Sequence, residues 1–470
     1  MKKFLIIIGI FSLYFCSLYA QQPLKYEKWE QPFYFRGFCI SDWNNLEDVF
    51  VTQEEFDELK AIGANLAIIQ SGGTFDETPP YSPNVWYSEP GDTIFWQDVL
   101  DSMVTFAQNA EIYYVISIRT GPGRFDVAES DSSTIWKNVY EQELYGKMLK
   151  DIAKRYLPDS LFIGFDLTVE PNPLSEILGE PVTLLDSALI ANGIDVNLIY
   201  TLWIDSVRTV APDLPLMVEG VHWSNPVYFS LVSKQLDNKI VYKTHCYNPD
   251  DYSHAENPFV VTYPGTFWSI TLQGSALFDK LFLSETVYSP VRNFQQANNV
   301  PILIGEFGLN LPQNGGEKYL SDIMSIAENY GWHFSLWNWN NTAEFNYPHF
   351  DQAYGTHYMD SILIYLNRQT TSIKNSNLSN SVISNFLLVQ NYPNPFNPTT
   401  AIKYQIPELN FVTIKVYDVL GNEIATLVNE EKQTDIYKVN FYSENLVSGI
   451  YFYKLQANEF AQVKKMILLK

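Results

Sequence analysis

The stretch Leu161-Phe-Ile-Gly-Phe-Asp-Leu-Thr-Val-Glu170-Pro171 joins a short apolar run to an acidic residue that proline follows directly. A short run that is apolar throughout, with β-branched and aromatic residues, predicts a strand buried on both faces, as strands of a parallel sheet are. Proline cannot continue a central strand, so the strand must end before Pro171. The stretch therefore predicts a buried parallel strand whose carboxyl end presents Glu170.

Seven further runs of this kind occur in the first 368 residues. With the run just described, the predicted strands are Tyr34–Cys39, Asn65–Gln70, Ile112–Ile118, Leu161–Leu167, Leu216–Glu219, Ile240–Cys246, Ile302–Gly305 and His333–Trp337. Amphipathic stretches between them predict helices at Gln53–Ile62, Trp96–Asn109, Trp136–Tyr156, Val196–Val210, Val291–Asn298 and Tyr319–Tyr330.

This regular alternation predicts an α/β domain with a parallel sheet, and eight strands are the number that closes a (β/α)8 TIM barrel. An open doubly wound sheet would give a similar alternation. That fold often carries a glycine-rich phosphate-binding loop, which the sequence lacks, and the barrel is therefore favoured.

The pattern changes after Leu366. Residues Gln369–Asn385 are rich in Thr, Ser and Asn without periodicity, which predicts a flexible linker. Short β-rich runs separated by turn signals follow at Ala401–Ile406, Val412–Asp418, Glu423–Val428, Tyr437–Tyr442, Gly449–Ala457 and Gln462–Leu469. They predict a small all-β immunoglobulin-like sandwich. We expect a barrel at 21–368, a linker at 369–385 and a sandwich at 386–470.

The chain begins with the features of a secretory signal peptide at residues 1–20. Two lysines precede the apolar run Phe4–Tyr19, and the small residue Ala20 follows it. The run is short for a membrane-spanning helix, so cleavage is favoured over a retained anchor. Cleavage leaves Cys39 and Cys246, which we expect to be buried thiols; a disulfide is the alternative.

Composition limits the partners. The formal net charge is −23, and all of it lies upstream of Asn385, because the remainder has 8 Lys against 8 Asp plus Glu. An acidic domain repels nucleic-acid phosphates and anionic lipid. Aromatic residues make up 15% of the chain, which suits a surface that stacks on flat rings. A neutral partner such as a polysaccharide is compatible with both features.

Two glutamates carry the predicted chemistry. In a barrel, reactive groups gather where strands end, and Glu170 and Glu306 follow the fourth and seventh predicted strands. Hydrolysis of a glycosidic bond needs two facing carboxyl groups: one protonates the leaving oxygen and the other attacks the anomeric carbon. A salt-bridged or solvated glutamate is the alternative for each alone. Small or rigid neighbours on both glutamates favour the chemical interpretation of the pair.

The first 368 residues resemble glycoside hydrolase family 5, the cellulase family. The motifs that carry the resemblance occur in the family's order, at Phe35-Arg-Gly37, Val169-Glu-Pro171, His245-x-Tyr247, Ile304-Gly-Glu-Phe-Gly308 and Trp337. The resemblance implies that Glu170 is the acid/base and Glu306 the nucleophile. It also implies that His245 and Tyr247 orient and tune these carboxylates, and that Trp337 is a platform for the sugar.

Three positions depart from the family pattern. Asparagine usually precedes the acid/base and binds the sugar 2-hydroxyl, but Val169 stands here. The arginine of strand two is absent, and Arg119 replaces the histidine of strand three. In our interpretation Arg119 supplies the missing cation, and Asn172 or Gln70 supplies a polar contact. The departures leave a glycan-binding barrel without turnover as an alternative, and a transglycosylase as another.

Aromatic residues near the predicted strand ends are candidates for stacking sugars in outer subsites. They are Trp43, Trp86, Trp223, Trp268 and Trp339. Histidine spacing suggests no metal site, and no cofactor is implied. The hypothesis is a secreted retaining β-glycosidase that hydrolyses a β-1,4-glucan or mannan.

The C-terminal region resembles a type IX secretion sorting domain. The motifs are Asn391-Tyr-Pro-Asn-Pro-Phe-Asn-Pro-Thr-Thr400, Val416-Tyr-Asp-Val-Leu-Gly421, Ser448-Gly-Ile-Tyr-Phe-Tyr453 and Lys464-Lys-Met-Ile-Leu-Leu-Lys470. The resemblance implies transport through the periplasm, recognition by outer-membrane secretion machinery, and release or attachment at the cell surface. A carbohydrate-binding sandwich, with tyrosines exposed on one face, is the alternative.

Overall fold

The structure is a computed structural model. It describes residues 25–41, 51–71, 96–124, 133–173, 185–269, 274–339, 344–368, 387–388, 391, 396–406, 409–419, 421–443, 446–458 and 460–469. The predicted signal peptide and linker, together with Trp43 and Trp86, lie outside these residues. The chain divides into two compact units, Met1–Thr370 and Thr371–Lys470.

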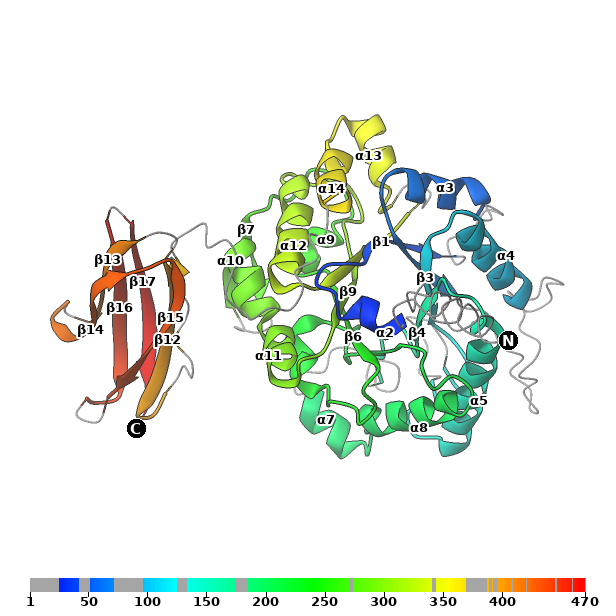
Figure 1. The fold of residues 1–470 in the computed structure, drawn as a ribbon, viewed down its shortest axis with the longest axis horizontal. Helices are drawn as coiled ribbons and strands as arrows, with labels where there is room; N and C mark the ends of the chain where they lie inside the picture. The colour runs from blue at the N-terminus through cyan, green and yellow to red at the C-terminus, as the bar shows by residue number, and fades with distance from the viewer. Residues whose placement is uncertain are drawn as a thin grey trace, which may run out of the picture. The chain divides into compact units, whose positions relative to one another are not determined.

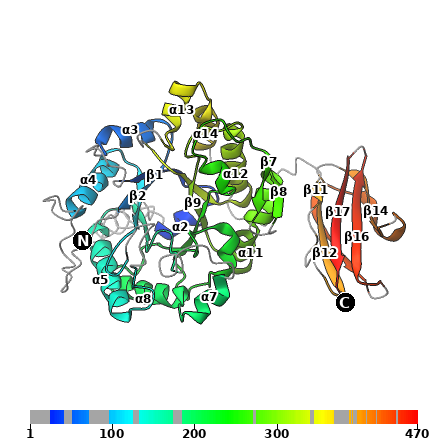
Figure 2. The same cartoon turned by 180° about the vertical axis from the view of Figure 1, so that it is seen from behind.

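The first unit is built on a closed barrel of eight parallel strands in the order β1-β10-β9-β6-β5-β4-β3-β2 (Figures 1 and 2). The strands are β1 Arg36–Ser41, β2 Leu66–Ser71, β3 Tyr113–Ile118, β4 Phe162–Asp166, β5 Leu216–Glu219, β6 Ile240–Cys246, β9 Ile302–Phe307 and β10 His333–Leu336. All eight predicted strands are confirmed, and their bounds differ from the prediction by at most two residues.

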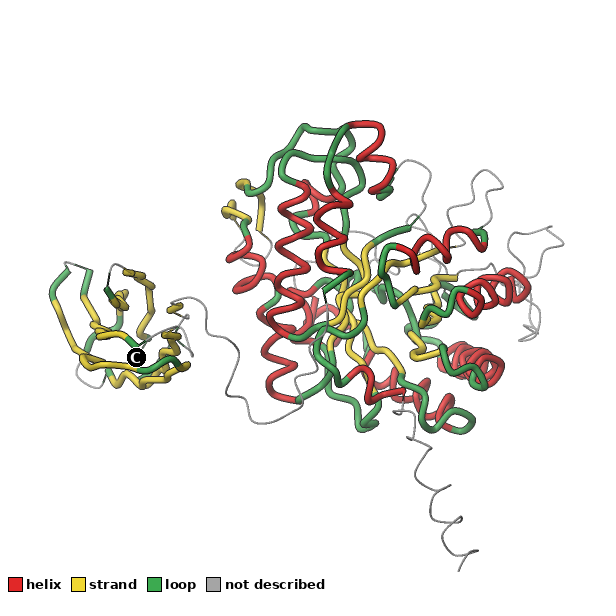
Figure 3. The backbone as a smooth tube through the Cα atoms, turned by 45° about the horizontal axis from the view of Figure 1, so that its top comes forward, coloured by secondary structure: helices red, strands yellow, loops and turns green. Residues whose placement is uncertain are grey.

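Helices surround the barrel (Figure 3). The α-helices are α2 Lys25–Trp29, α3 Gln53–Ala61, α4 Trp96–Asn109, α5 Val139–Tyr156, α7 Leu185–Ala191, α8 Val196–Arg208, α9 Asp250–Ser253, α10 Lys280–Phe282, α11 Ser289–Asn298, α12 Gly316–Tyr330, α13 Tyr347–Tyr354 and α14 Tyr358–Leu366. A 3-10 helix, η1, spans Pro226–Leu231, and a π-helical turn, η2, spans Leu283–Val287.

Capping residues explain where some helices begin. Thr52 and Glu55 form the capping box of α3. The helix predicted from Trp136 instead begins at Val139, because the Asn138 side chain accepts a hydrogen bond from the Tyr140 amide (3.2 Å) and caps α5 there.

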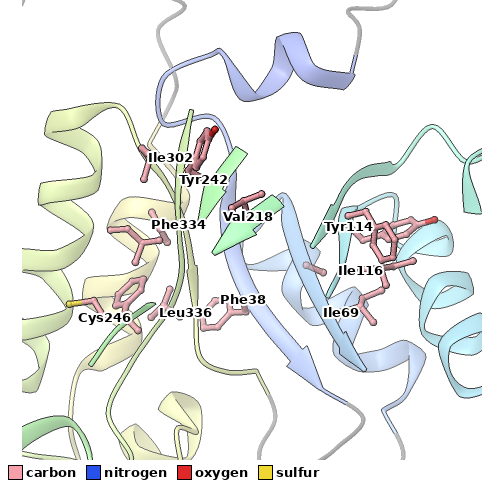
Figure 4. Packing of buried hydrophobic residues seen from close by; sticks show 14 of the residues in the cluster. Phe38, Ile69, Tyr114, Ile116, Val218, Tyr242, Cys246, Ile302, Phe334 and Leu336 are labelled. Atoms are coloured by element: carbon pink, nitrogen blue, oxygen red, sulfur yellow. The ribbon is translucent and has the colours of Figure 1, made fainter. Parts of the chain in front are cut away.

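Side chains of the barrel strands alternate between two cores, as the period of two in a strand requires. Ile69 and Ile116 face outward and pack with the helices (Figure 4). Their neighbours Ile68 and Val115 face the barrel interior. Cys39 and Cys246 are buried free thiols, as predicted.

Helix α2 closes the amino-terminal end of the barrel, which we call the floor. The indole of Trp29 donates to the Ile163 carbonyl oxygen (2.8 Å). His333 contacts the Trp29 carbonyl oxygen through Nε2 (2.8 Å), and its Nδ1 accepts the Phe35 amide (3.1 Å). Because the floor is packed, a ligand site must lie at the carboxyl end of the strands, which we call the mouth.

One antiparallel hairpin was not predicted. Strands β7 Gly265–Ser269 and β8 Gly274–Phe278 lie between β6 and β9 in sequence and form a separate two-stranded sheet. Their side chains alternate between exposed and partly buried, and this places Trp268 on the exposed face.

The second unit is a sandwich of two antiparallel sheets in the orders β11-β12-β15 and β14-β13-β16-β17. The strands are β11 Leu387–Leu388, β12 Thr399–Ile406, β13 Asn410–Tyr417, β14 Glu423–Lys432, β15 Asp435–Tyr442, β16 Gly449–Ala457 and β17 Phe460–Leu468. Asn391 is buried, its amide donates to the Tyr453 hydroxyl (2.8 Å), and its side chain donates to Thr400 (2.9 Å). Among the described helices of the chain, none is long and apolar enough to cross a membrane.

Candidate active site

The two predicted catalytic glutamates meet at the mouth. Glu170 lies in the loop after β4, and Glu306 lies in β9, which β5 and β6 separate from β4 around the barrel. One carboxylate oxygen from each and one ring nitrogen of His245 all lie within 4.8 Å of one another. Glu306 is 2% exposed and the Glu170 side chain is 15% exposed. The site is therefore a largely dehydrated pair of carboxyl groups.

Strand β6 supplies the partners of this pair. His245 Nδ1 lies 2.8 Å from Glu170 Oε1 and 3.5 Å from Glu306 Oε1. The Tyr247 hydroxyl donates to Glu306 Oε2 (3.1 Å). His245 lies in β6 and Tyr247 directly follows this strand; residues two apart along an extended segment share a face, so both groups reach the carboxylates.

Two residues from β2 and the end of β3 complete the opposite side. Gln70 donates through Nε2 to Glu306 Oε1. Arg119 lies 3.6 Å from Glu170 Oε2, donates to Gln70 Oε1 (3.3 Å), and has its guanidinium 5.9 Å from the centre of the Trp337 ring. Arg119 and Gln70 therefore occupy the positions in which the sequence predicted a cation and a polar contact.

The backbone of the acidic loop is held in an uncommon conformation. Glu170 has φ of 49°, in the left-handed region that side chains other than glycine disfavour. The Glu170 amide donates to Glu219 Oε2 (2.7 Å), and its carbonyl oxygen accepts from Arg124 (3.2 Å). These contacts from both sides fix the loop at the place where its carboxyl group is presented.

A lysine lies below the carboxylates, inside the barrel. Lys243 Nζ is 2.7 Å from Asp166 Oδ2 and 2.6 Å from Glu219 Oε1, and all three side chains are fully buried. A Cβ atom on Gly305 would lie 2.0 Å from Lys243 Cε, so the lysine stem fills the space that the glycine leaves.

The pKa values of the site depend on these neighbours. Burial lowers the pKa of His245, but the carboxylates of Glu219 and Glu306 outweigh burial and raise it to about 10. Burial raises the pKa of Glu306. Burial also favours a higher pKa at Glu170, but the hydrogen bond and charge of His245, with the charge of Arg119, lower it. The raised pKa favours the imidazolium form of His245 at neutral pH.

Glu170, His245 and Glu306 also have the donor atoms of a metal site. A metal ligand must be a neutral imidazole with a free lone pair. Because His245 lies among three carboxylates and its raised pKa favours the protonated ring, the trio is better suited to hold protons than a metal ion.

The remaining predicted residues lie around this cluster. Trp337 is 8% exposed and packs in the interior core at the mouth. Asn172 is buried in the loop that follows Glu170. Trp223 is 41% exposed in the loop after β5, with its ring 4.7 Å from that of His222. Trp339 is buried against Phe38 and belongs to the core.

The sequence did not identify Glu219, Lys243 or Arg124 as members of the site. A signal existed for two of them. Glu219 ends the fifth predicted strand, and Lys243 shares a strand face with His245 because two positions separate them. A lysine in an apolar strand is ordinarily expected at the surface, which obscured this signal.

Comparisons with known proteins support the barrel assignment. The family model "Cellulase (glycosyl hydrolase family 5)" matches residues 26–343. Endoglucanase C of Acetivibrio thermocellus is 19% identical over 322 residues, which cover 62% of this chain and 84% of that protein. Cellodextrinase A of Ruminococcus flavefaciens is 23% identical over 214 residues, covering 45% and 57%.

Solved structures share the fold at low identity. The structure of Thermotoga maritima Cel5A in complex with a mannotriose substrate has a TM-score of 0.52 and 18% identity, and the match covers 73% of this chain and 99% of that one. The cellulose synthase subunit Z of Clostridioides difficile has a TM-score of 0.51 and 20% identity, covering 71% and 100%.

A second family model, "Secretion system C-terminal sorting domain", matches residues 390–469 and implies secretion or location at the cell surface. The match to the cellulase family covers more than half of the chain, together with the closed eight-stranded barrel. The chain therefore belongs to glycosyl hydrolase family 5 and is a glycoside hydrolase of the cellulase type that carries a secretion sorting domain.

Proposed function

We propose that the protein is a retaining β-glycosidase that hydrolyses a β-1,4-linked glucan or mannan by double displacement. The observation that carries the proposal is the separation of the two carboxyl groups, which have oxygens within 4.8 Å of each other. Retaining enzymes place their carboxyls about 5–5.5 Å apart, whereas inverting enzymes need about 6.5–9.5 Å to admit a water.

Each glutamate has one role in the proposed reaction. Glu306 attacks the anomeric carbon while the glycosidic bond breaks, and Glu170 gives its proton to the leaving oxygen. Water then attacks the glycosyl ester on Glu306, gives a proton to Glu170 and releases the sugar, so both glutamates return to their starting states. Tyr247 and Gln70 donate hydrogen bonds to Glu306 and favour its ionised form.

The pKa shifts of the free site run against these two roles. Burial raises the pKa of Glu306, and His245 with Arg119 lowers the pKa of Glu170, whereas the reaction starts with Glu306 ionised and Glu170 protonated. A glycosidic oxygen beside Glu170 accepts a hydrogen bond only from the protonated carboxyl. Substrate binding therefore favours the protonated form of Glu170, which the first step needs.

The proposed glycan extends toward the hairpin β7–β8. A cavity of about 180 Å³ lies there, lined by His222, Asn225, Asn248, Asp250, Asp251 and Trp268, among others. Trp268 is 60% exposed, and a flat indole beside amide and carboxylate groups suits a sugar ring with its hydroxyls. We assign this cavity to an outer sugar subsite.

Product analysis tests the proposed function. Wild type, Glu170→Ala and Glu306→Ala are assayed on a panel of β-glucans and mannans, with azide added to replace the missing group. We expect azide to give a β-glycosyl azide from Glu170→Ala and an α-glycosyl azide from Glu306→Ala, because each variant lacks a different step. Inversion at the anomeric carbon by wild type would contradict double displacement.

A glycan-binding barrel without turnover is the second candidate, and Val169 favours it. Val169 is fully buried, and its side chain offers no hydrogen bond to a sugar 2-hydroxyl. In glycosidases such hydrogen bonds strengthen in the transition state. Glycan binding without hydrolysis by wild type would support this candidate, and products longer than the substrate would identify a transglycosylase.

We also propose export through the predicted signal peptide and the periplasm, followed by passage through outer-membrane machinery that recognises residues 390–469. Deletion of residues 386–470 in the native host is expected to retain the enzyme in the periplasm. Unchanged extracellular activity would contradict this route.

A further inference from the structure

A chain of alternating charges runs through the barrel interior to the carboxylates. In order of contact it consists of Asp166, Lys243, Glu219 and His245, and it ends on Glu170. The first four side chains are fully buried. Burial of charged groups costs free energy unless each group has a partner. A row of four buried charged side chains in a barrel core therefore points to a functional role that offsets this cost.

Glu219 links the row of buried charges to the candidate active site. Its Oε1 lies 2.6 Å from Lys243 Nζ and 3.3 Å from His245 Nε2. Its Oε2 accepts the backbone amide of Glu170 (2.7 Å). One carboxylate therefore holds Glu170 at two points: directly through the backbone, and through the imidazole that contacts the Glu170 side chain (2.8 Å).

The charge count of the cluster requires protons. Four carboxyl groups, from Asp166, Glu170, Glu219 and Glu306, face the permanent cations of Lys243 and Arg119. The carboxyl groups therefore outnumber the permanent cations by two. Three of these carboxyls surround the imidazole of His245, and a proton on this ring reduces the excess negative charge.

We propose that Glu219 and Lys243 are positioning residues: Lys243 fixes Glu219, and Glu219 holds both the backbone of Glu170 and an imidazolium at His245. The proposal rests on the proposed function of Glu170 as the acid/base and adds the two residues that aim it. Neither touches the reacting atoms.

The strained loop supports this role. A residue held at φ of 49° costs about 1–3 kcal/mol, and it persists only where neighbours over-determine it. Glu219 accepts the amide of Glu170 itself, so loss of the carboxylate would release the loop and the imidazole together.

Several charged groups around His245 affect its pKa, directly or through their neighbours. Glu170, Glu219 and Glu306 raise the pKa of the imidazole, and Lys243 on its own strand opposes them. Beyond these, Arg119 and His254 act on Glu170, and Cys39 faces Lys243 and Glu306 from β1. Among the ion pairs of the described residues, Glu219 is the one that reaches Nε2 of the ring, at 3.3 Å and without a hydrogen bond.

Leaving-group dependence tests the positioning role. In Glu219→Gln we expect kcat/KM on a β-glucan oligosaccharide to fall about 10- to 100-fold, as loss of an outer partner typically does. On dinitrophenyl β-cellobioside, whose leaving group needs no protonation, we expect a fall of less than about 3-fold. Equal losses on both substrates, or no loss on either, would overturn the proposal.

Two controls separate the possible failures. Glu55→Gln removes another buried carboxylate, in the capping box of α3, and is expected to leave the ratio of the two activities unchanged. Glu170→Ala must itself show the leaving-group dependence. If it does and Glu219→Gln does not, this inference fails alone; if Glu170→Ala does not, the proposed function fails.

Imidazole NMR gives a readout that does not need turnover. With ¹⁵N-labelled histidine, and the His245 signals identified by their loss in His245→Gln, we expect both ring nitrogens of the wild type to be protonated at pH 8. In Glu219→Gln the ring should titrate at least about one pH unit lower. A neutral His245 in the wild type at pH 8 would overturn the proposal even if the variant failed to fold.

Discussion

Two histidines, one at each end of the barrel, are both 1% exposed and have opposite proton affinities. At the floor, burial lowers the pKa of His333 to about 4. At the mouth, carboxylates overcome burial and raise the pKa of His245 to about 10. His333 contacts only backbone groups through its ring nitrogens, whereas His245 lies among Glu170, Glu219 and Glu306.

The difference in pKa between His333 and His245 distinguishes a buried polar group that stabilises the fold from one that serves the active site. The neutral imidazole of His333 accepts from one amide and donates to one carbonyl, so it closes the floor without any charge. The imidazolium of His245 lies beside charged groups that a stable core would avoid. We therefore expect changes at the floor to alter stability, and changes at the mouth to alter activity.

The largest effect is expected at the mouth. Glu306→Gln should lower hydrolysis at least about 10⁴-fold, because it removes the proposed nucleophile. The free energy of unfolding should stay the same or rise, because the cluster loses one of four buried carboxyl groups. Hydrolysis assays and urea unfolding measure the two effects. A variant that is both active and less stable would contradict the contrast.

At the floor we expect the reverse result, a loss of stability without a loss of activity. His333→Ala should lower the free energy of unfolding by about 2–4 kcal/mol, because it leaves a buried amide and a buried carbonyl without partners and opens a cavity. The activity of each folded molecule should not change. His357→Ala, at a side chain that is 78% exposed, serves as the control and should change stability by less than about 0.5 kcal/mol. Loss of activity in folded His333→Ala would break the comparison.

The pH dependence of stability is a further test of the contrast between His333 and His245. His333 has a lowered pKa, so the unfolded chain binds its proton more readily; stability should fall by up to about 3 kcal/mol as pH drops from about 6.5 through 4. His245 has a raised pKa, so its contribution is complete below about pH 6.5 and is lost as pH rises through about 10.

Urea unfolding of His333→Gln and His245→Gln across this pH range checks both signs. The difference from wild type should change on the acidic side for His333→Gln and on the alkaline side for His245→Gln. Two variants with parallel curves would show that the surroundings do not divide the two histidines in this way.

The smallest effect is expected at the edge of the mouth. Trp268→Ala should raise KM for long oligosaccharides about 3- to 10-fold and leave short substrates unaffected, because it removes a stacking surface in the outer cavity. Leu277→Ala, on the same exposed face of the hairpin but outside the cavity lining, is the matched control. Equal effects of both changes, or none, would remove the subsite from the proposal.

Much of the fold could be predicted from local pattern. The apolar runs gave all eight barrel strands, because buried parallel strands leave a signal in a few consecutive residues. The hairpin β7–β8 was missed, since exposed and partly buried residues alternate in its strands and it therefore lacks the continuous apolar run of a strand buried on both faces. Helices α13 and α14 were not among the predicted helices either.

The residues of the candidate active site also fall into those that local sequence patterns predict and those that they do not. Glu170, Glu306, His245 and Tyr247 could be selected from sequence, because each follows or ends a strand within a family motif. Glu219 and Lys243 could not be assigned, because their roles depend on the register of β5 and β6, which pairs Glu219 with Lys243. Arg124 depends on how the loop after β3 folds back onto Val169 and Glu170, and no local pattern encodes that contact.

Gly305 has a consequence for how this barrel can vary. The lysine stem passes through the volume where an alanine methyl group would stand, so positions 305 and 243 are sterically linked across two neighbouring strands. A relative with a long side chain at position 243 has to keep glycine at 305, whereas a relative with a small residue at 243 is free to carry alanine. The glycine that precedes the proposed nucleophile thus serves here as room for a cation, and the two positions are expected to change together during divergence.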